Sequence, residues 1–575
     1  MRAKFVIAAW IVAVGSAIPS VEAQGGTDGS ILVVDAARFL TDIPRGHVVV
    51  EARGLGSPWL FNNLGLSLRS QDPLATVVQV PKAGKYRLFV RSQGDAGSAF
   101  RVEVAGRESS GVFGNHAGMG WAAGGEFELP AGSHPVRVTP ITGRPAFDLM
   151  VLTTKQAVTD EDVKALQLNP DVQLLREYAI PRAGALKFGD VTGDGKTDFV
   201  VLSPNYSTYV FDHDGKELWR WEAPEENARL RAQFEAPGSI WDFDEDGKAE
   251  LIHWRAMEGK EWLVMADGAT GAVKFRAEWP TQPLPHVYNN FRTAIARLRR
   301  GRPNDLVVFT DSGGRMSITA YSNKLEQRWE HVEEKKKDHL GHYVYPVDVN
   351  GDGVDEVCVS HLCLTSAGKP LWDNFNVFDD HHDHVDDMKW ADIDGDGALE
   401  FVGGTSDAGL LAVRAQTGEI VWQHMAEHTQ QVEIGRFLKG EPGLQIAATG
   451  RVYGRPGEGG LSAVLRFFDA KGNLLRKWPR SPIAGNPDFV HGDWSGNGKP
   501  ELFWHRFRIN EEGRGDLYFS EPVYHMFDFM SSGAEQVITH NGTTLKVYGK
   551  AGSKPKTVRR SADYIRSSIA NHSHY

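Results

Sequence analysis

The sequence is poor in cysteine, since its 575 residues include only Cys358 and Cys363. Two thiols form at most one disulfide, which excludes the class of small secreted domains held together by several disulfides. The fold must therefore be stabilised mainly by burial of apolar side chains. Both cysteines lie in the apolar segment 357–364, and we interpret them as packing residues, with a local disulfide as the alternative.

Long hydrophobic runs are also missing. A membrane-spanning helix needs about 18 consecutive apolar residues, and no segment after the first 23 residues approaches that length. The apolar segment 5–14 follows Arg2 and Lys4 and leads to small residues that end at Ala23. This order predicts a secretory signal peptide, residues 1–23. We therefore expect a secreted or periplasmic protein without a membrane span.

Positive charge is in deficit, with 63 Lys and Arg against 74 Asp and Glu and a net charge of −11. Phosphate binding relies on a basic surface, so this balance argues against a nucleic-acid partner. An acidic polysaccharide stays compatible, because bound cations and local basic residues can reverse the potential inside one cleft. We expect the chain to act as a monomer.

Five segments repeat one pattern, in which Asp is followed by alternate oxygen-bearing residues, Gly at the sixth position and a carboxylate at the ninth. Such oxygens point into a tight turn, the glycine allows its bend, and the ninth residue closes a cage of hard ligands suited to Ca²⁺. The pattern predicts calcium sites formed by Asp190, Thr192, Asp194 and Asp198; Asp242, Asp244, Asp246 and Glu250; Asp348, Asn350, Asp352 and Glu356; Asp392, Asp394, Asp396 and Glu400; and Asp493, Ser495, Asn497 and Glu501.

An apolar strand, such as 199–202, follows these loops where an EF-hand would have a helix, so the loops lie between strands. Weaker copies near 295–308, 434–448 and 527–538 bring the number of units to eight. The 62 glycines and 10% aromatic residues agree with a turn-rich β protein. We therefore predict an all-β fold with an eight-bladed β-propeller at residues 156–575.

Residues 24–155 lack the repeat and contain alternating strands after glycine turns. The segments 83–91, 129–138 and 146–152 resemble strands of the jelly-roll carbohydrate-binding modules. The resemblance implies an N-terminal β-sandwich jelly roll at residues 24–155. The polar stretch around Thr153–Asp162 is the expected linker.

The segment 378–390 is unusual because it places histidines among aspartates directly before a calcium loop. In a propeller, residues that precede the innermost strands converge at one end of the channel. A histidine beside an aspartate can be a general base, a metal ligand or a surface residue. Adjacent residues such as His381 and His382 face opposite sides of a strand and cannot both hold one ion.

Several stretches, in one order along the chain, resemble the secreted rhamnogalacturonan lyases with an eight-bladed propeller and FG-GAP-type calcium loops. They are 218–222 with 227–229, 241–250, 290–298 with 301–303, 341–342 before 348–353, and 384–386 before 392–394. Two differences concern the substrate: those lyases have a histidine soon after the arginine that matches Arg229, and an Arg-Phe pair where this chain has Asn290-Phe291. Their Asn-Gly-Thr segment has only a doubtful counterpart at 541–543.

The resemblance implies a polysaccharide lyase that performs β-elimination at a uronosyl residue of a rhamnose-containing glycan. Calcium or arginine would neutralise the uronate, a histidine held by a carboxylate would take the C5 proton, and a lysine of lowered pKa is the alternative base. Catalytic roles fall to Arg229, Arg292, His342, His384, Asp386 and Lys389, and substrate binding to Asn289, Asn290, Tyr343, His382 and His428.

Three alternatives stay open. The substrate could be an ulvan-type or gum-type glycan with rhamnosyl-glucuronate units. The chain could instead be a non-catalytic, calcium-dependent glycan-binding or adhesion propeller, similar to those of integrin heads. It could also be a hydrolase that uses paired carboxylates such as Asp380 and Asp386.

Overall fold

The computed structural model describes residues 30–36, 38–39, 46–50, 55–61, 64–164, 166, 172–224, 238–280, 290–312, 315–334, 341–377, 383–425, 428–452, 462–477, 489–511, 513, 515–519, 521–552 and 561–572. They fall into two compact units, with the main boundary after residue 167. The predicted signal peptide, residues 1–23, lies outside the described residues. None of the described helices is long and apolar enough to cross a membrane.

The N-terminal unit consists of two antiparallel sheets. The larger contains β1 (Ile31–Asp35), β2 (Val48–Val50), β3 (Gly65–Ser67), β5 (Gly84–Gln93), β8 (Gly120–Leu129) and β10 (Ala146–Thr153). The smaller contains β4 (Leu74–Val80), β6 (Ala99–Val104), β7 (Arg107–Glu108) and β9 (Gly132–Thr142). The sheets pack through aromatic side chains, since the rings of Phe100 and Phe147 lie 6.2 Å apart.

The linker expected around Thr153–Asp162 belongs instead to this unit. It leads into α1 (Asp160–Lys164), and the Asp160 carboxylate accepts hydrogen bonds from Trp121 Nε1 at 2.8 Å and Arg91 Nε at 3.1 Å. The polar composition of the stretch suggested a solvated linker, but its acidic side chain is tied into the sandwich. The predicted boundary at residue 155 is therefore too early.

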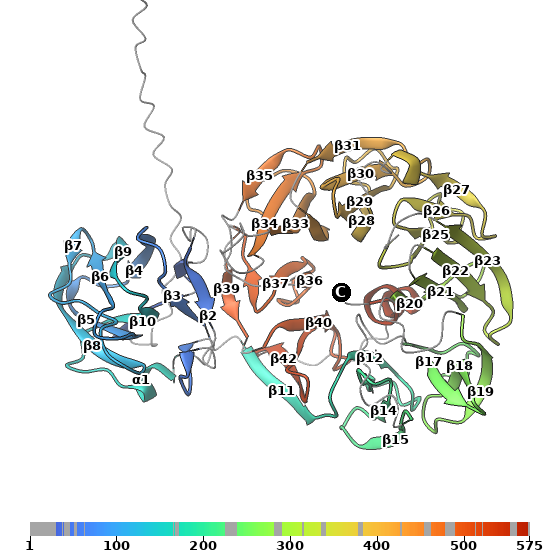
Figure 1. Cartoon of the computed structure of the whole chain (residues 1–575), viewed down its shortest axis with the longest axis horizontal. Helices are drawn as coiled ribbons and strands as arrows, with labels where there is room; N and C mark the ends of the chain where they lie inside the picture. Colours follow the sequence, from blue (N-terminus) through green and yellow to red (C-terminus); the bar gives the residue numbers. More distant parts are fainter. Residues whose placement is uncertain are drawn as a thin grey trace, which may run out of the picture. The chain divides into compact units, whose positions relative to one another are not determined.

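The C-terminal unit contains, in its described part, eight four-stranded antiparallel sheets arranged around one centre (Figure 1). The first four sheets are β12 (Ala185–Gly189), β13 (Asp198–Leu202), β14 (Thr208–Phe211) and β15 (Glu217–Trp221); β16 (Gly238–Trp241), β17 (Glu250–Met257), β18 (Lys260–Asp267) and β19 (Val273–Glu278); β20 (Asn290–Ala296), β21 (Asp305–Ser312), β22 (Arg315–Tyr321) and β23 (Gln327–Glu334); and β24 (Tyr345–Val347), β25 (Glu356–Val359), β26 (Leu362–Leu364) and β27 (Pro370–Asp373).

The fourth sheet is followed by a short 3₁₀ helix, η6 (Phe375–Val377). The remaining sheets are β28 (Val385–Ala391), β29 (Glu400–Thr405), β30 (Leu410–Arg414) and β31 (Ile420–His424); β32 (Thr429–Gly435), β33 (Gln445–Val452), β34 (Ser462–Asp469) and β35 (Leu474–Lys477); β36 (Phe489–Gly492), β37 (Glu501–Trp504), β38 (Phe507–Ile509) and β39 (Gly515–Tyr518); and β40 (Val523–Phe527), β41 (Gln536–His540), β42 (Thr544–Lys550) and β11 (Val172–Ala179). The all-β prediction is confirmed.

The eighth sheet joins the two ends of this unit. Its outer strand β11 comes from the start of the unit and pairs with β42 near the end, from Val172 opposite Lys550 to Ala179 opposite Thr544. The first strand of every sheet lies nearest the centre and the fourth lies at the rim (Figure 1). Each Asp-rich loop connects the first strand of its sheet to the second, so the prediction that these loops lie between strands is confirmed.

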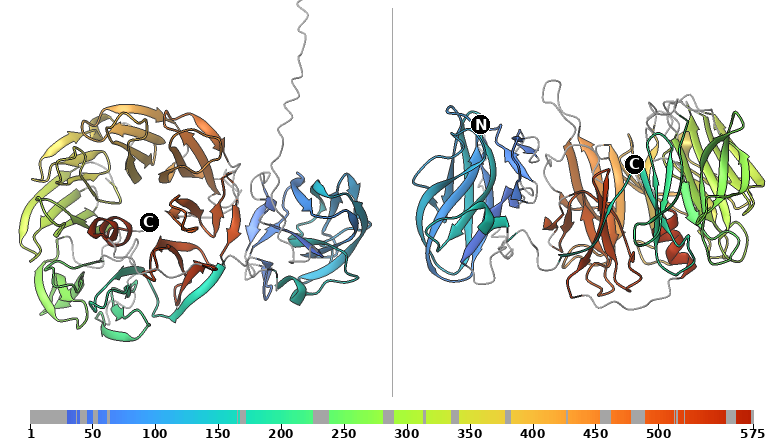
Figure 2. Two further views of the ribbon diagram at one scale, coloured as in Figure 1. Left: turned by 180° about the vertical axis from the view of Figure 1, so that it is seen from behind. Right: turned by 90° about the horizontal axis from the view of Figure 1, so that it is seen from below.

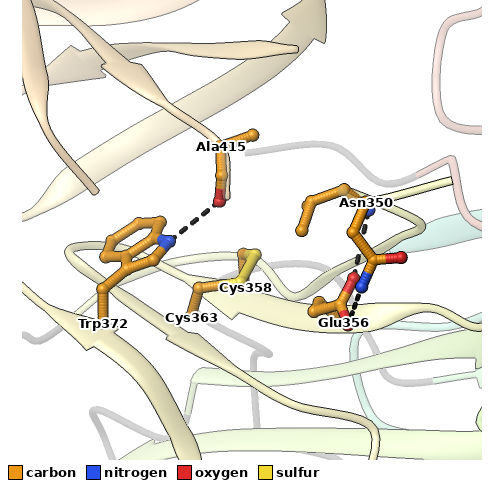
Figure 3. Close-up of a disulfide and its surroundings, with 7 residues drawn as sticks. Asn350, Glu356, Cys358, Cys363, Trp372 and Ala415 are labelled. Carbon is orange, nitrogen blue, oxygen red and sulfur yellow. Dashed lines mark hydrogen bonds between the residues drawn. A yellow bond between two sulfur atoms is a disulfide. The ribbon is translucent and has the colours of Figure 1, made fainter. Parts of the chain in front are cut away.

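A repeated tryptophan contact fastens successive sheets. An indole on the fourth strand of one sheet donates a hydrogen bond to a carbonyl in the turn between the third and fourth strands of the next. The bonds are Trp219 to Gly268 at 2.8 Å, and Trp329 to Ser366, Trp372 to Ala415 and Trp422 to Ala470, each at 2.9 Å. Figure 3 shows the bond from Trp372 to Ala415. Tyr178 on β11 makes the matching contact from the eighth sheet to the first, because its hydroxyl donates to His213 O at 2.6 Å.

Cys358 and Cys363 form a disulfide with an S–S distance of 2.06 Å (Figure 3). The interpretation of both as unbonded packing residues was wrong. A tight turn at Ser360 and His361 makes the two cysteines direct partners across β25 and β26, which brings their side chains together. Both are fully buried, so they also pack as expected.

The C-terminal segment enters the ring of sheets (Figures 1 and 2). It consists of α2 (Ala562–Ile565) and one π-helical stretch, η8 (Arg566–Ala570), which contacts β12, β16 and β20. Asn571 Nδ2 donates to Ile295 O at 3.0 Å and its Oδ1 accepts from Ile295 N at 2.7 Å. The segment therefore braces several sheets from inside.

His253 on β17 is a buried histidine whose tautomer is fixed by its neighbours. Arg255 Nε donates to His253 Nε2 at 2.9 Å, so that nitrogen carries no proton, and Nδ1 lies 2.9 Å from Thr208 Oγ1. Burial, assisted by the charge of Arg255, holds the pKa of His253 well below its usual range. The folded protein therefore keeps this ring neutral.

We expect stability to fall as the pH drops below about 6.5, because the unfolded chain then binds a proton at His253 that the folded chain excludes. The loss from this residue is up to about 1.4 kcal/mol per pH unit. Urea unfolding at pH 7.5 and pH 5.5 measures it. The variant His253→Gln should show a smaller dependence on pH, and an unchanged slope would contradict the assignment.

Candidate functional site

The site lies where the first strands of neighbouring sheets begin. β20, β24, β28 and β32 start at residues 290, 345, 385 and 429 and belong to consecutive sheets. β20 contacts β24, β28 contacts β32, and a hydrogen bond from Tyr345 to Asp387 connects β24 with β28. Side chains at or just before these starts therefore gather at one end of the ring. This brings together His342, His384 and His428, which are distant in sequence.

The three histidines surround the carboxylate of Asp386. His342 Nε2 lies 3.1 Å from His384 Nε2 and 3.5 Å from Asp386 Oδ1, and His384 Nε2 lies 3.8 Å from the same oxygen. His428 Nε2 approaches the other oxygen, Oδ2, at 3.3 Å. His342 and Asp386 are buried, whereas the His384 side chain keeps 14% of its surface exposed. We call these four residues the histidine cluster.

A β-bulge explains how Asp386 reaches this cluster. The register of β28 against β29 shifts between Val385 and Asp387, which leaves Asp386 without a cross-strand partner. Asp387 accepts instead from Tyr345 Oη at 3.1 Å. The carboxylates of Asp386 and Asp387 therefore point to different partners, the histidine cluster and Tyr345. Bulges near active sites often redirect a side chain in this way.

The cluster is strongly coupled electrostatically. Burial raises the pKa of Asp386, but the imidazoles of His384, His428 and His342 that face its two oxygens lower it by more, so its pKa lies well below the usual range. Burial lowers the pKa of His384, yet the negative charge of the neighbouring Asp386 raises it by more. The neighbouring Asp386 therefore makes His384 more basic, and greater basicity suits a proton acceptor.

The same side chains could hold a divalent cation. Ligand atoms of His342, His384 and Asp386 all lie within 4.8 Å of one another. Imidazole nitrogens 3.1 Å apart are compatible with one N–H donating to the other ring or with both rings binding one ion.

A cavity of about 660 Å³ is lined by Arg292, Tyr343, Lys389 and His491. The cluster residues do not line it, but Tyr343 and Asp387, which do, directly follow His342 and Asp386 in the chain. The Arg292 guanidinium lies 5.3 Å from the centre of the Tyr343 ring. The cavity thus contains a cationic group and an aromatic face, both of which suit a uronic acid. Its volume falls in the usual range for small-ligand sites.

Lys389 lies between carboxylates in this cavity. Its ammonium is 2.8 Å from both oxygens of Asp387 and 3.8 Å from Glu433, and its side chain keeps 31% of its surface exposed. Such partners stabilise the charged form, whereas a base must be neutral. Lys389 as the alternative base stays a prediction.

Sequence reasoning missed the pair formed by Glu433 and His491. Glu433 Oε2 lies 2.6 Å from His491 Nδ1, and its charge raises the pKa of His491, whose side chain keeps 40% of its surface exposed. The prediction considered residues that precede the inner strands, whereas Glu433 lies within β32. Its signal in the sequence was a charged residue in the apolar run 432–434 of an inner strand.

Some predicted site residues cannot be placed. Arg229, Asn289 and His382 lie outside the described residues, as does the side chain of Asn290. Of the predicted residues in the described part, the cluster unites His342, His384, His428 and Asp386, and the cavity unites the remainder, Arg292, Tyr343 and Lys389.

The Asp-rich loops lie at the far ends of the inner strands. β28 has seven residues, with His384 before it and the loop from Asp392 after it, so the two are separated by about 20 Å. Calcium in that loop could not reach a sugar at His384. In each loop the ninth carboxylate accepts a hydrogen bond from a backbone N–H at the second or third position, as Asp198 does from Val191 at 2.9 Å.

No protein-family model matches this sequence, and no curated protein does. Among solved structures, the chain is similar to the exotype rhamnogalacturonan lyase YesX, with 17% identity, a TM-score of 0.50, and coverage of 89% of this chain and 90% of the other. It is also similar to the Bacillus licheniformis rhamnogalacturonan lyase PL11, with 16% identity, a TM-score of 0.51, and coverage of 93% and 94%. It is likewise similar to the rhamnogalacturonan lyase YesW, with 17% identity, a TM-score of 0.50, and coverage of 91% of this chain and 92% of the other. The chain thus shares the fold of these lyases.

Proposed function

We propose that this chain is a polysaccharide lyase that cleaves a rhamnose- and uronic-acid-containing glycan by β-elimination. The proposal includes an eight-bladed β-propeller as the catalytic domain and an N-terminal jelly roll that contacts carbohydrate. The observation that carries it is the histidine cluster, whose three imidazoles surround one buried carboxylate beside a cavity with Arg292. The fold shared with rhamnogalacturonan lyases supports it.

The chemistry follows from the acidity of the C5 proton. Negative charge develops on the uronate as this proton leaves, and the guanidinium of Arg292 in the cavity would stabilise that charge. His384 would take the proton at Nε2 while the C5–H electrons form the C4–C5 double bond and the C4–O bond breaks. His342, 3.1 Å from His384, or a water would protonate the departing oxygen.

We also propose Ca²⁺ as a structural cofactor in Asp-rich loops of the FG-GAP type. Bound calcium would neutralise the carboxylates that crowd each turn. We propose that the protein is exported, because a disulfide such as Cys358–Cys363 persists in oxidising compartments, and that it acts as a monomer.

The test is an assay with rhamnogalacturonan, ulvan-type and gum polysaccharides that records absorbance near the ultraviolet edge. We expect absorbance to rise with at least one of these substrates, because β-elimination creates an unsaturated uronate. Reducing ends without this absorbance would indicate a hydrolase, and binding without either signal would indicate an adhesion propeller.

A further inference from the structure

The Asp-rich loops differ in whether the chain supplies its own cation. In the loop from Asp392, the guanidinium of Arg414 lies 2.8 Å from Asp396 Oδ2 and 3.3 Å from Asp394 Oδ2, and it forms a closer ion pair with Glu400. Asp394, Asp396 and Glu400 stand at the third, fifth and ninth positions of the loop. Arg414 is the cross-strand partner of Glu400, so its position follows from the pairing of β29 with β30.

The loop from Asp242 contains a similar arrangement. Lys274 on β19 places its ammonium 2.8 Å from Asp244 Oδ2 and 2.5 Å from Glu250 Oε1. Arg302 Nη2 lies 3.2 Å from Asp242 Oδ2. Lys274 thus pairs with the carboxylates at the third and ninth positions of this loop, and Arg302 with the carboxylate at the first.

The loop from Asp493 has the least charge, since Ser495 and Asn497 stand at its third and fifth positions. Its ninth residue, Glu501, is already paired with Arg508 Nη1 at 2.7 Å. The Lys550 ammonium lies 3.3 Å from Ser495 Oγ. Two cationic groups thus reach this turn.

The loops from Asp190 and Asp348 are different. Asp198 accepts from the backbone N–H groups of Val191, Thr192 and His213, and Glu356 accepts from Val349 N and Asn350 Nδ2. Among the ion pairs of the described residues, the predicted ligand positions of these two loops take part in one, between Lys196 and Asp194 at 3.4 Å, with both side chains about half exposed. Arg566 pairs with Asp355, the eighth residue of the loop from Asp348, which is not a predicted ligand. Exposed pairs of this kind contribute little.

In the part of the chain that the structure describes, the ion pairs therefore give Asp198 and Glu356 no cationic partner of the kind that Lys274 provides to Glu250 and Arg414 to Glu400. A bound divalent cation would supply it.

We propose that Lys274, Arg414 and Arg508 are built-in counter-ions that replace calcium in the loops from Asp242, Asp392 and Asp493. Calcium then binds only the loops from Asp190 and Asp348. The inference rests on the proposed calcium dependence and narrows it to two loops. Three carboxylates in the loop from Asp242, and three in the loop from Asp392, lie within 4.8 Å of one another, as a metal site requires. A calcium ion in the loops from Asp242, Asp392 and Asp493 would nevertheless need the oxygens that the cations contact, and would be repelled at close range.

The test counts calcium bound to the full-length protein by equilibrium dialysis followed by elemental analysis. Asp352→Asn is expected to lose one ion, whereas Asp394→Asn should bind as many as the unmodified protein. Arg414→Ala should gain one ion, because it frees three carboxylates. The matched control Arg220→Ala removes an exposed arginine whose partner is Glu217 and should leave the count unchanged.

Circular dichroism confirms that each variant is folded, and its unfolding temperature with and without chelator gives a second measurement. A loss of one ion in Asp394→Asn, or no gain in Arg414→Ala, would overturn the inference while leaving the proposed lyase activity intact. A protein that binds no calcium at all would overturn both the inference and the calcium part of the proposed function. Failure of the lyase assay would leave the calcium counts unaffected.

Discussion

Replacement of His384 by alanine is expected to lower turnover about 10²–10⁴-fold, which is the usual contribution of a positioned general base. The physical reason is the position of its Nε2 atom, 3.8 Å from Asp386 Oδ1 and at the partly exposed side of the cluster. The rate of absorbance increase near the ultraviolet edge, with the best substrate found, measures the effect. Substrate binding should change much less than turnover.

His331→Ala is the matched control, because His331 lies on the rim strand β23 and pairs only with Glu333 among the ion pairs of the described residues. It should retain full activity. Elemental analysis of His384→Ala adds a second measurement, because loss of a transition metal or calcium together with activity would assign His384 to metal binding. Full turnover in His384→Ala would remove it from the mechanism.

Replacement of Arg566 by alanine is expected to lower the free energy of unfolding by about 3–5 kcal/mol, the range for removing one partner of a buried ion pair. Arg566 pairs with Asp355, which is fully buried beside β25. Without the guanidinium, that carboxylate is left in the protein interior with only the Arg297 backbone N–H, 2.6 Å away, as a described donor. Urea unfolding monitored by tryptophan fluorescence measures the change.

The double variant Arg566→Ala with Asp355→Asn should recover part of this loss, since no buried charge then lacks its partner. Arg315→Ala is the control on the surface, where the pair with Glu334 at 3.6 Å is exposed and contributes less than about 1 kcal/mol. If Arg566→Ala were as stable as this control, the C-terminal segment would not brace the ring as the contacts imply.

The prediction of loops between strands succeeded because the repeat is local. Gly195 and Gly397 sit at φ +84° and +93°, which fixes a tight turn wherever the pattern occurs. The following apolar residues must then leave the turn as a strand. The weaker copy near 527–538 is likewise the connection between β40 and β41, although it lacks most of the acidic residues.

The predictions that failed concern pairs of residues whose separation depends on packing. Cys358 and Cys363 meet because a two-residue turn makes them cross-strand partners, and the apolar run around them has no marker for that turn. The polar stretch at 153–162 has the composition of a linker, yet Asp160 is tied to Arg91 by the sandwich. In both cases the composition of the segment does not show which residue the fold places beside it.

The sequence by itself determined the all-β class, the position of every Asp-rich turn and the residue types available for catalysis, because turn geometry and strand periodicity are properties of short segments. Only the tertiary structure decided that His342, His384 and His428 meet at Asp386, and that Lys274 and Arg414 enter loops far from them in the chain. Those meetings depend on how sheets follow one another around the centre and on the register between strands, which no short segment encodes.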